Sequence, residues 1–207
     1  MTLAAGFHDV PAGHVPTVVT HLEMTTMPLL RPAPPPPPSP RGPWTIARAE
    51  RIDLAWYRAL YRRIGTDWLW SARLLMADGA LAALLNHPDF ELWTLRQEAV
   101  DEGIAELDFR EPGHCELRLF GVTAGLIGTG AARTLMNHAI ARAWARPGLR
   151  RFWLHTCTLD HPRALAFYIR SGFVPFRYQV EIMPDPRLDG TLPADAAPGV
   201  PIIRPAR

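Results

Sequence analysis

The 207-residue sequence predicts an α+β protein whose sheet is mixed but mostly antiparallel, with one β-α-β crossover. Residues 92–96, 104–109 and 116–122 are short apolar runs separated only by turn-like clusters, a pattern typical of an antiparallel meander. Residues 135–144 then carry apolar side chains at helical spacing, and residues 151–156 form another strand pattern. A strand, a helix and a strand in that order form a parallel crossover, so both strand arrangements are expected in one sheet.

The folded domain is expected to begin near Trp44, directly before a short strand. The elements expected ahead of the meander are a strand at 45–48 and helices at 54–63, after 66–67 and at 78–86. Asp53 is placed to cap the first of these helices, because an aspartate there accepts a hydrogen bond from a free backbone amide.

The chain after the central helix repeats the strand-helix-strand pattern. The elements expected there are the strand at 151–156, a helix that starts at 160–162 and ends at 171–172, and a last strand at 173–182. The proline- and aspartate-rich tail from Pro184 onward is expected to be mostly loop.

The N-terminal 43 residues differ in composition from the rest. Residues 17–24 are β-branched and partly alternating, so they form either an edge strand of the sheet or part of a disordered tail. Residues 34–38 are consecutive prolines, which predicts a polyproline spacer with no packing of its own. The expected organisation is an extension at 1–43, a domain at 44–183 and a C-terminal tail at 184–207.

The composition argues against a nucleic-acid binder or a membrane protein. All 22 basic residues are arginine, the formal net charge is only +2, and the arginines are spread along the chain. No apolar stretch approaches the roughly 20 residues that span a bilayer. The N-terminus also lacks a basic segment followed by an apolar run, so we expect a cytoplasmic protein in which Cys115 and Cys157 are reduced thiols.

A glycine-punctuated turn links the strand at 116–122 to the central helix. Gly125, Gly128 and Gly130 allow a close approach to the backbone, and the first amides of the following helix have no partners within the helix. A phosphate group fits such a site, although glycines can also serve turn geometry alone. The spacing matches neither a dinucleotide-binding fingerprint nor a P-loop, since the chain contains no lysine.

With these motifs, residues 44–183 resemble the GNAT superfamily of acyl-CoA N-acyltransferases, and in particular bacterial members without an assigned substrate. The turn Ile127-Gly-Thr-Gly-Ala-Ala132 is similar to the family's pyrophosphate-binding motif. Ala164-Leu-Ala-Phe-Tyr168, followed by Ser171-Gly-Phe173, is similar to the second motif, A-x-x-[FL]-Y-x-x-x-G-F. One strand separates the two motifs, as in the family. The resemblance implies a mixed, mostly antiparallel sheet with helices on both faces.

The resemblance also implies acetyl-CoA as cosubstrate, with no metal. The pantetheine is expected to pair with residues 120–122, where a backbone amide would polarise the thioester carbonyl. Ile127 stands where the family commonly has a basic or amide residue, and His161 where it often has asparagine, so phosphate binding would rest on backbone amides, with charge from Arg133. The expected cofactor-binding residues are Phe120, Gly121, Val122, Ile127, Gly128, Thr129, Gly130, Ala131, Ala132, Arg133 and His161.

The reaction that the family implies is direct attack of an amine on the thioester. By its position in the family motif, Tyr168 is expected to protonate the leaving thiolate, unless it is only a core tyrosine. A general base is also needed, and Glu116 is the first candidate and Glu106 the second. Either glutamate could instead be solvated or paired with Arg118.

Other readings of the same residues have less support. His155, Cys157 and His161 match no standard zinc spacing, and nothing supports a cysteine nucleophile. Trp68 and Trp70 are core residues or the wall of an acceptor cleft.

The sequence therefore predicts an N-acetyltransferase that acts on a primary amine of a small molecule or peptide. A non-catalytic acyl-CoA-binding regulatory or interaction domain is the alternative, and O-acyl transfer is a third reading. We expect no nucleic-acid or membrane partner, and a homodimer stays open.

Overall fold

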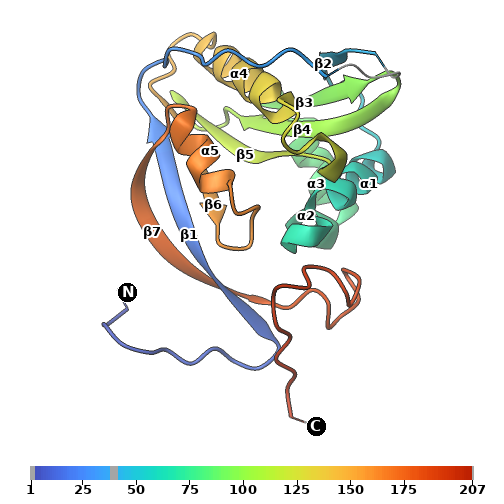
Figure 1. Ribbon diagram of the computed structural model, residues 1–207, viewed down its shortest axis with the longest axis vertical. Coiled ribbons are helices and arrows are strands. Elements are labelled where there is room, and N and C mark those ends of the chain that lie inside the picture. The colour runs from blue at the N-terminus through green and yellow to red at the C-terminus, as the bar shows by residue number, and fades with distance from the viewer. Residues whose placement is uncertain (1–2, 38–41, 207) are drawn as a thin grey trace.

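The computed structural model describes residues 3–37 and 42–206, in which seven strands form one sheet in the order β2-β3-β4-β5-β6-β1-β7 (Figure 1). The strands are β1 (His14–Met24), β2 (Trp44–Arg48), β3 (Phe90–Gln97), β4 (Val100–Asp108), β5 (His114–Val122), β6 (Arg151–Cys157) and β7 (Val174–Pro184). The helices are α1 (Leu54–Gly65), η1 (Thr66–Trp68), α2 (Ala72–Leu75), α3 (Asp78–Leu85), η2 (Ala124–Leu126), α4 (Ala131–Trp144) and α5 (Ala164–Arg170). The predicted fold class is confirmed.

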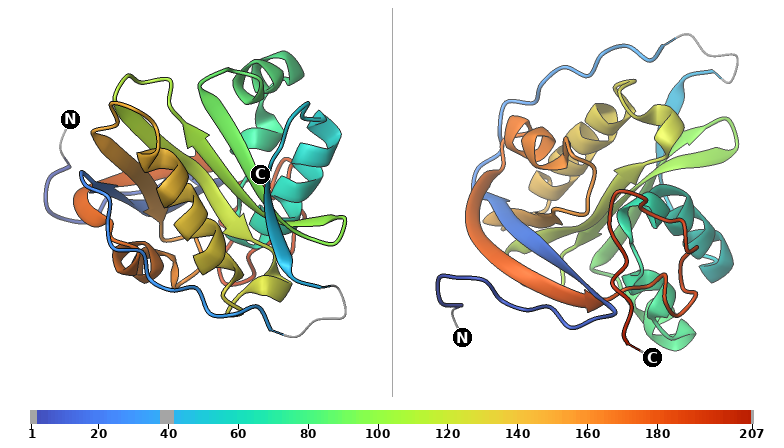
Figure 2. Two further views of the ribbon diagram at one scale, coloured as in Figure 1. Left: turned by 90° about the horizontal axis from the view of Figure 1, so that it is seen from above. Right: turned by 60° about the horizontal axis from the view of Figure 1, so that its bottom comes forward.

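Helices cover both faces of the sheet (Figure 2). On β4, Ala105 belongs to the apolar cluster that contains Leu135 of α4 and Tyr168 of α5. Its neighbour Ile104 belongs to the cluster that contains Tyr57 of α1. Because successive strand residues point to opposite faces, α4 and α5 form one outer layer and α1 and α3 the other.

Strands β3 to β5 form the expected antiparallel meander. Strand β2 adds to it by pairing antiparallel with β3, and β5 pairs with β6 in parallel. Asp53 caps α1 as predicted, since its Oδ1 accepts a hydrogen bond from the Trp56 amide at 2.7 Å. The helix expected from 160–162 begins at Ala164 instead. The reason is that the Asp160 carboxylate turns back to the end of β6, where it accepts from Thr156 Oγ1 and the Cys157 amide.

The expectation that residues 17–24 form an edge strand is wrong. Strand β1 lies between β6 and β7 and pairs antiparallel with both, so β6 and β7 run parallel to each other (Figure 1). Both faces of β1 carry buried apolar side chains, Val19 on one and Leu22 on the other. A strand that is apolar on both faces is stable only inside a sheet, and β7 takes the edge position.

The proline-rich segment is also more than a spacer. It runs past α5 and the start of α4, where the Asn137 side-chain amide donates to the Arg31 carbonyl at 2.7 Å. The ring of Pro34 lies so close to Gly130 that a Cβ atom on the glycine would overlap it. Pro34 therefore packs on the first turn of α4, whereas the last proline of the run, Pro38, lies outside the described residues.

The C-terminal tail forms neither helix nor strand in its described part, as predicted, but it is packed. Arg187 and Asp185 form an ion pair at 2.7 Å with both side chains 2% exposed. Arg187 also donates to the carbonyls of Ala196 and Val200, and Leu192 packs in a cluster with Leu69. None of the helices in residues 3–37 and 42–206 is long and apolar enough to cross a bilayer.

Candidate active site

A cavity of about 490 Å³ opens where β5 and β6 part. The parallel pairing between these strands stops at Glu116 opposite Trp153, so beyond this point β5 has no neighbour on that side. The cavity is lined by the end of β5, the glycine turn, the start of α4 and the segment from Asp160 to Arg170. A backbone edge of β5 is thus left open at the place where the sequence predicts the cofactor chain.

A β-bulge at Arg118 sets the orientation of the open part of β5. The register with β4 shifts there, with Leu117 opposite Leu107 and Leu119 opposite Glu106. Leu117 therefore packs in the α4 layer and Leu119 against the α1 layer, although a regular strand would place both on one face. The extra residue in the bulged strand is the physical reason, because it reverses the alternation of side chains.

Past the bulge, aromatic rings line the cavity. Phe120 stacks on Phe167 with ring centroids 5.8 Å apart and meets Tyr168 edge-on at 6.2 Å. Its neighbour Gly121 lies directly under α1, where a Cβ atom would come within 2.5 Å of Ile64 Cγ2. Glycine at 121 therefore lets α1 approach the strand next to the cavity.

The glycine turn keeps an open approach to the start of α4. Gly128 and Gly130 have φ values of +84° and +97°, a left-handed conformation that other residues adopt only under strain. Nothing lies within 4 Å of a Cβ built on Gly128. Gly130 is the N-cap of α4 and has no side chain, and the Ala131 amide donates to Thr129 Oγ1 at 3.4 Å, so an anion would be held by the other amides of this first turn.

Most of the predicted cofactor-binding residues line this one cavity. They are Phe120, Gly121, Val122, Ile127, Gly128, Gly130, Ala132, Arg133 and His161. Ala131 and Thr129 do not line it. Ala131 is fully buried in the core, and the Thr129 hydroxyl donates to the Leu126 carbonyl at 2.7 Å, which braces the turn.

The charge of the cavity wall suits a phosphate-bearing ligand. Arg31, Arg133, Arg163 and Arg170 line it, whereas Asp160 is its one carboxylate among the described residues. The Arg133 guanidinium donates to Ser171 Oγ at 2.8 Å and stacks on Phe167. Burial lowers the pKa of Arg133, and the neighbouring Arg31 and Arg170 lower it further, so an anion here would relieve repulsion between like charges.

Arg31 and Asp160 are site residues that the sequence alone did not identify. Arg31 belongs to the segment taken for a spacer, and no local pattern indicates its contact with α4. Asp160 was read only as a helix start, but its Oδ1 accepts from Trp70 Nε1 at 3.0 Å and so joins the cavity wall to the region of α1 and α2.

Tyr168 is the one ionisable phenol among the described residues that line the cavity. It is 8% exposed and packs edge-on against Phe173. Burial raises the pKa of Tyr168 well above the usual value near 10, and the negative charge of Asp160 adds to the rise. The phenol therefore keeps its proton at neutral pH, so a proton is present at this point of the cavity wall.

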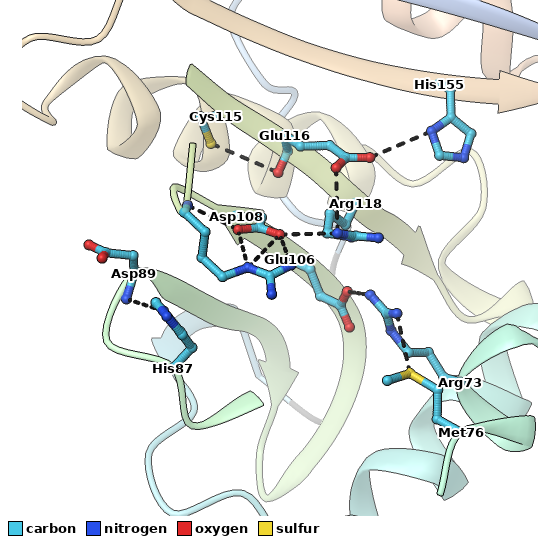
Figure 3. A network of polar contacts seen from close by, with 11 residues as sticks. Arg73, Met76, His87, Asp89, Glu106, Asp108, Cys115, Glu116, Arg118 and His155 are labelled. Carbon is cyan, nitrogen blue, oxygen red and sulfur yellow. Dashed lines mark hydrogen bonds and ion pairs between the residues drawn. The ribbon is translucent and has the colours of Figure 1, made fainter. Parts of the chain in front are cut away.

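The two candidate bases, drawn in Figure 3, lie on the face of the sheet away from α4. Their neighbours along the strands, Ala105 and Leu107 for Glu106 and Cys115 and Leu117 for Glu116, all pack in the α4 layer. Glu116 has a 15% exposed side chain, with Arg118 Nη1 and His155 Nδ1 each 3.7 Å from one of its oxygens. Burial raises the pKa of Glu116, and Asp108 raises it further, against the opposing effect of Arg118. A carboxylate with a raised pKa is a better proton acceptor than an ordinary glutamate.

Glu106 is held in a different way. Its side chain is fully buried, and Arg73 Nη2 donates to Oε2 at 2.7 Å (Figure 3). The Tyr57 hydroxyl donates to Oε1. Both carboxylate oxygens are therefore occupied by donors, which suits a structural ion pair better than a base.

His155 is the remaining titratable side chain beside Glu116. Burial lowers the pKa of His155 and outweighs the opposing effects of Asp160 and Glu181, so the imidazole is neutral at neutral pH. The sequence singled out this histidine only as a metal ligand. Among the residues that the structure describes, no group of three His, Cys, Asp or Glu side chains could hold a metal ion. Burial raises the pKa of both Cys115 and Cys157, which disfavours the thiolate that a cysteine nucleophile needs.

A mixed sheet that splits beside a glycine turn, with an arginine-rich cavity in the gap, is the arrangement expected of an acyltransferase. Residues 55–173 match the sequence profile of the Acetyltransferase (GNAT) family, which is more than half of the chain. The protein belongs to this family. No curated protein sequence matches the chain.

Solved structures show the same fold. A GCN5-related N-acetyltransferase from Sphaerobacter thermophilus has a TM-score of 0.56 at 18% identity, with 82% of this chain and 52% of that chain covered. The ribosomal-protein-S18-alanine N-acetyltransferase of Escherichia coli has a TM-score of 0.53 at 17% identity over 69% of this chain and 94% of that one. An aminoglycoside acetyltransferase from an uncultured soil metagenomic sample has a TM-score of 0.51 at 18% identity, covering 62% and 86%. The chain spans about half to two thirds of the length of the first three neighbours.

Proposed function

We propose that the protein transfers an acetyl group from acetyl-CoA to a primary amine of a small molecule or peptide. The observation that carries this proposal is the cavity between β5 and β6, which joins an arginine-rich mouth to the buried phenol of Tyr168. The open edge of β5 and the free helix amides fit a long, anionic cosubstrate better than a compact ligand.

The binding roles follow from where each group lies. Backbone groups of 120–122 would hold the pantetheine chain and polarise the thioester carbonyl, a contribution worth about 10² to 10³ in rate. The amides at 128–132 would hold the pyrophosphate, with charge supplied by Arg133 and Arg31. These arginines take the place of the basic side chain that Ile127 lacks.

The chemistry needs one proton donor and one acceptor. The amine nitrogen attacks the thioester carbon, a C–N bond forms, the C–S bond breaks, and the sulfur takes a proton from Tyr168. Glu116 takes the proton that the attacking amine loses, directly or through neutral His155. Glu106 serves the structure by anchoring Arg73.

We also propose that the protein is cytoplasmic, without nucleic-acid, membrane or metal partners.

The acceptor is proposed to be an amine. Two structural neighbours are described as acting on a ribosomal-protein alanine and on aminoglycosides, both of which carry amines. Amine transfer is therefore the first chemistry to test.

Isothermal titration with acetyl-CoA and with CoA tests the donor site. We expect micromolar binding of both. A non-catalytic acyl-CoA-binding domain is the alternative function, favoured by Ile127 in the turn. It would bind acetyl-CoA equally well but would release no thiol with any amine, whereas the absence of binding would leave only the fold.

A further inference from the structure

Strand β7 ends the sheet and is exposed to an unusual degree. Every residue from Val174 to Ile182 is exposed, although the strand pairs with β1 over its whole length. Its outer edge has no neighbouring strand in the described chain (Figure 1). A long exposed edge strand presents unpaired backbone groups that readily pair with another chain.

Apolar side chains follow one face of this edge. Tyr178 is 71% exposed, Val180 51% and Ile182 47%, and Val18 of the neighbouring strand β1 is 43% exposed beside Val180. A contiguous apolar row on a surface commonly marks an interaction site.

The sequence of β7 is complementary to itself. Residues 177–181 read Arg-Tyr-Gln-Val-Glu. In an antiparallel pair of two β7 strands with Gln179 on the two-fold axis, each Arg177 lies opposite Glu181 of the other strand. Each Tyr178 likewise lies opposite Val180. We propose that a second copy of this chain occupies the edge of β7 in this register and forms a homodimer with a continuous sheet.

Charge favours this register, because centring the pair on Tyr178 or Val180 would leave Arg177 and Glu181 without an unlike charge opposite. Neither Arg177 nor Glu181 forms a hydrogen bond or ion pair with another described side chain within the chain. Centring the pair on Arg177 or on Glu181 would place like charges opposite each other, and a parallel in-register pair would do the same. Directly opposed unlike charges and aromatic–β-branched pairs each stabilise a strand pair by about 0.2–1 kcal/mol. Because the dimer is two-fold symmetric, each of these pairs occurs twice in the interface.

The dimer leaves the candidate active sites free. None of residues 177–181 lines the cavity between β5 and β6, so the cavity stays open in each copy. The inference therefore does not depend on the proposed function.

A charge exchange tests the proposal. The full chain is analysed by sedimentation velocity over a wide concentration range, as wild type, as Arg177→Glu, as Glu181→Arg and as the double variant. We expect the wild type to dimerise. Each single variant should have a dissociation constant at least about tenfold higher, because two like charges then face each other at both copies of the 177–181 pair. The double variant should recover the dimer, since the exchanged charges again meet their opposites.

Arg204→Glu is the matched control, an exposed charge reversal outside β7 that should leave the dimer intact. Circular dichroism confirms that each variant is folded. A monomeric wild type, a dimer that neither single variant weakens, or a double variant that stays as weak as the singles would each overturn the proposal.

Discussion

Tyr168 and Glu116 lie on opposite faces of the sheet, on either side of the point where β5 leaves β6. Tyr168 packs in the α4 layer, in the same cluster as Cys115 and Leu117, the two residues that flank Glu116 along β5. Glu116 therefore points the other way, toward Arg118 and His155. A donor group and an acceptor group would thus reach a thioester in the gap from opposite sides.

Replacement of Tyr168 by phenylalanine tests the proton donor. We expect Tyr168→Phe to bind acetyl-CoA as the wild type does but to lose at least about tenfold in kcat, since proton transfer by a positioned acid contributes about 10² to 10⁴. Tyr178→Phe removes a phenol that is 71% exposed and should change neither quantity. Equal kcat in the two variants would show that Tyr168 is only a core residue.

The pH profile of kcat/KM tests the proton acceptor. Glu116 must be ionised to accept a proton, and burial raises its pKa, so activity should fall at a higher pH than for an ordinary glutamate near 4.3. Glu116→Gln should lower kcat/KM by about 100-fold and remove this acidic limb. The exposed Glu50→Gln serves as control, and an unchanged profile in Glu116→Gln would assign the base elsewhere.

The buried pair of Arg73 and Glu106 predicts a stability effect. Removing one partner leaves a buried charge without compensation, so Glu106→Gln and Arg73→Met should each lower the free energy of unfolding by about 3 kcal/mol. The double variant Arg73→Met, Glu106→Gln should lose less stability than the sum of the two single variants, because the charges of both partners are removed together. Urea denaturation measures all three, and strictly additive losses would contradict the coupling.

The ion pair between Glu91 and Arg142 should make the stability of the fold depend on pH. Burial opposes ionisation of Glu91, but hydrogen bonds from Arg142 and Trp93 outweigh it and lower the pKa of Glu91. The ion pair therefore stabilises the fold above the unfolded-state pKa near 4.3, and this contribution disappears as the pH falls through the lower folded-state value. Glu91→Gln should be less stable than the wild type at pH 7, and the difference should shrink toward pH 3. A constant difference would refute the assignment.

Replacement of Arg31 tests whether the N-terminal segment belongs to the cofactor site. Its side chain is exposed, so Arg31→Ala should weaken CoA binding only about fivefold, in line with about 1 kcal/mol for an exposed charge contact. Binding of pantetheine, which lacks the phosphates, should not change. Arg62→Ala, an exposed arginine on α1, is the control, and an equal loss for both ligands would argue against a phosphate contact.

Patterns of short range predicted much of this structure. Alternating apolar residues identified the meander, and Asp53 and the glycine turn identified helix starts. The position of β1 inside the sheet depends on pairing with strands more than 100 residues away, which no local pattern encodes. The bulge at Arg118 likewise depends on the register with β4.

The same distinction holds for the candidate site. The cavity-lining turn and Tyr168 followed from motifs in the sequence. Glu106 and Glu116 looked alike in sequence, and only the tertiary contacts separate a buried glutamate bound by Arg73 from a partly accessible one beside His155. Arg31 was missed because a proline-rich segment gives no signal of where it packs.

The most direct test of the account is release of free thiol from acetyl-CoA over a panel of primary amines, with the acetylated product identified by mass spectrometry. The account predicts amine-dependent release with one acetyl group added to the amine per thiol, abolished or strongly reduced in Tyr168→Phe. Tight binding of acetyl-CoA with no amine-dependent release across the panel would contradict it and support the non-catalytic alternative.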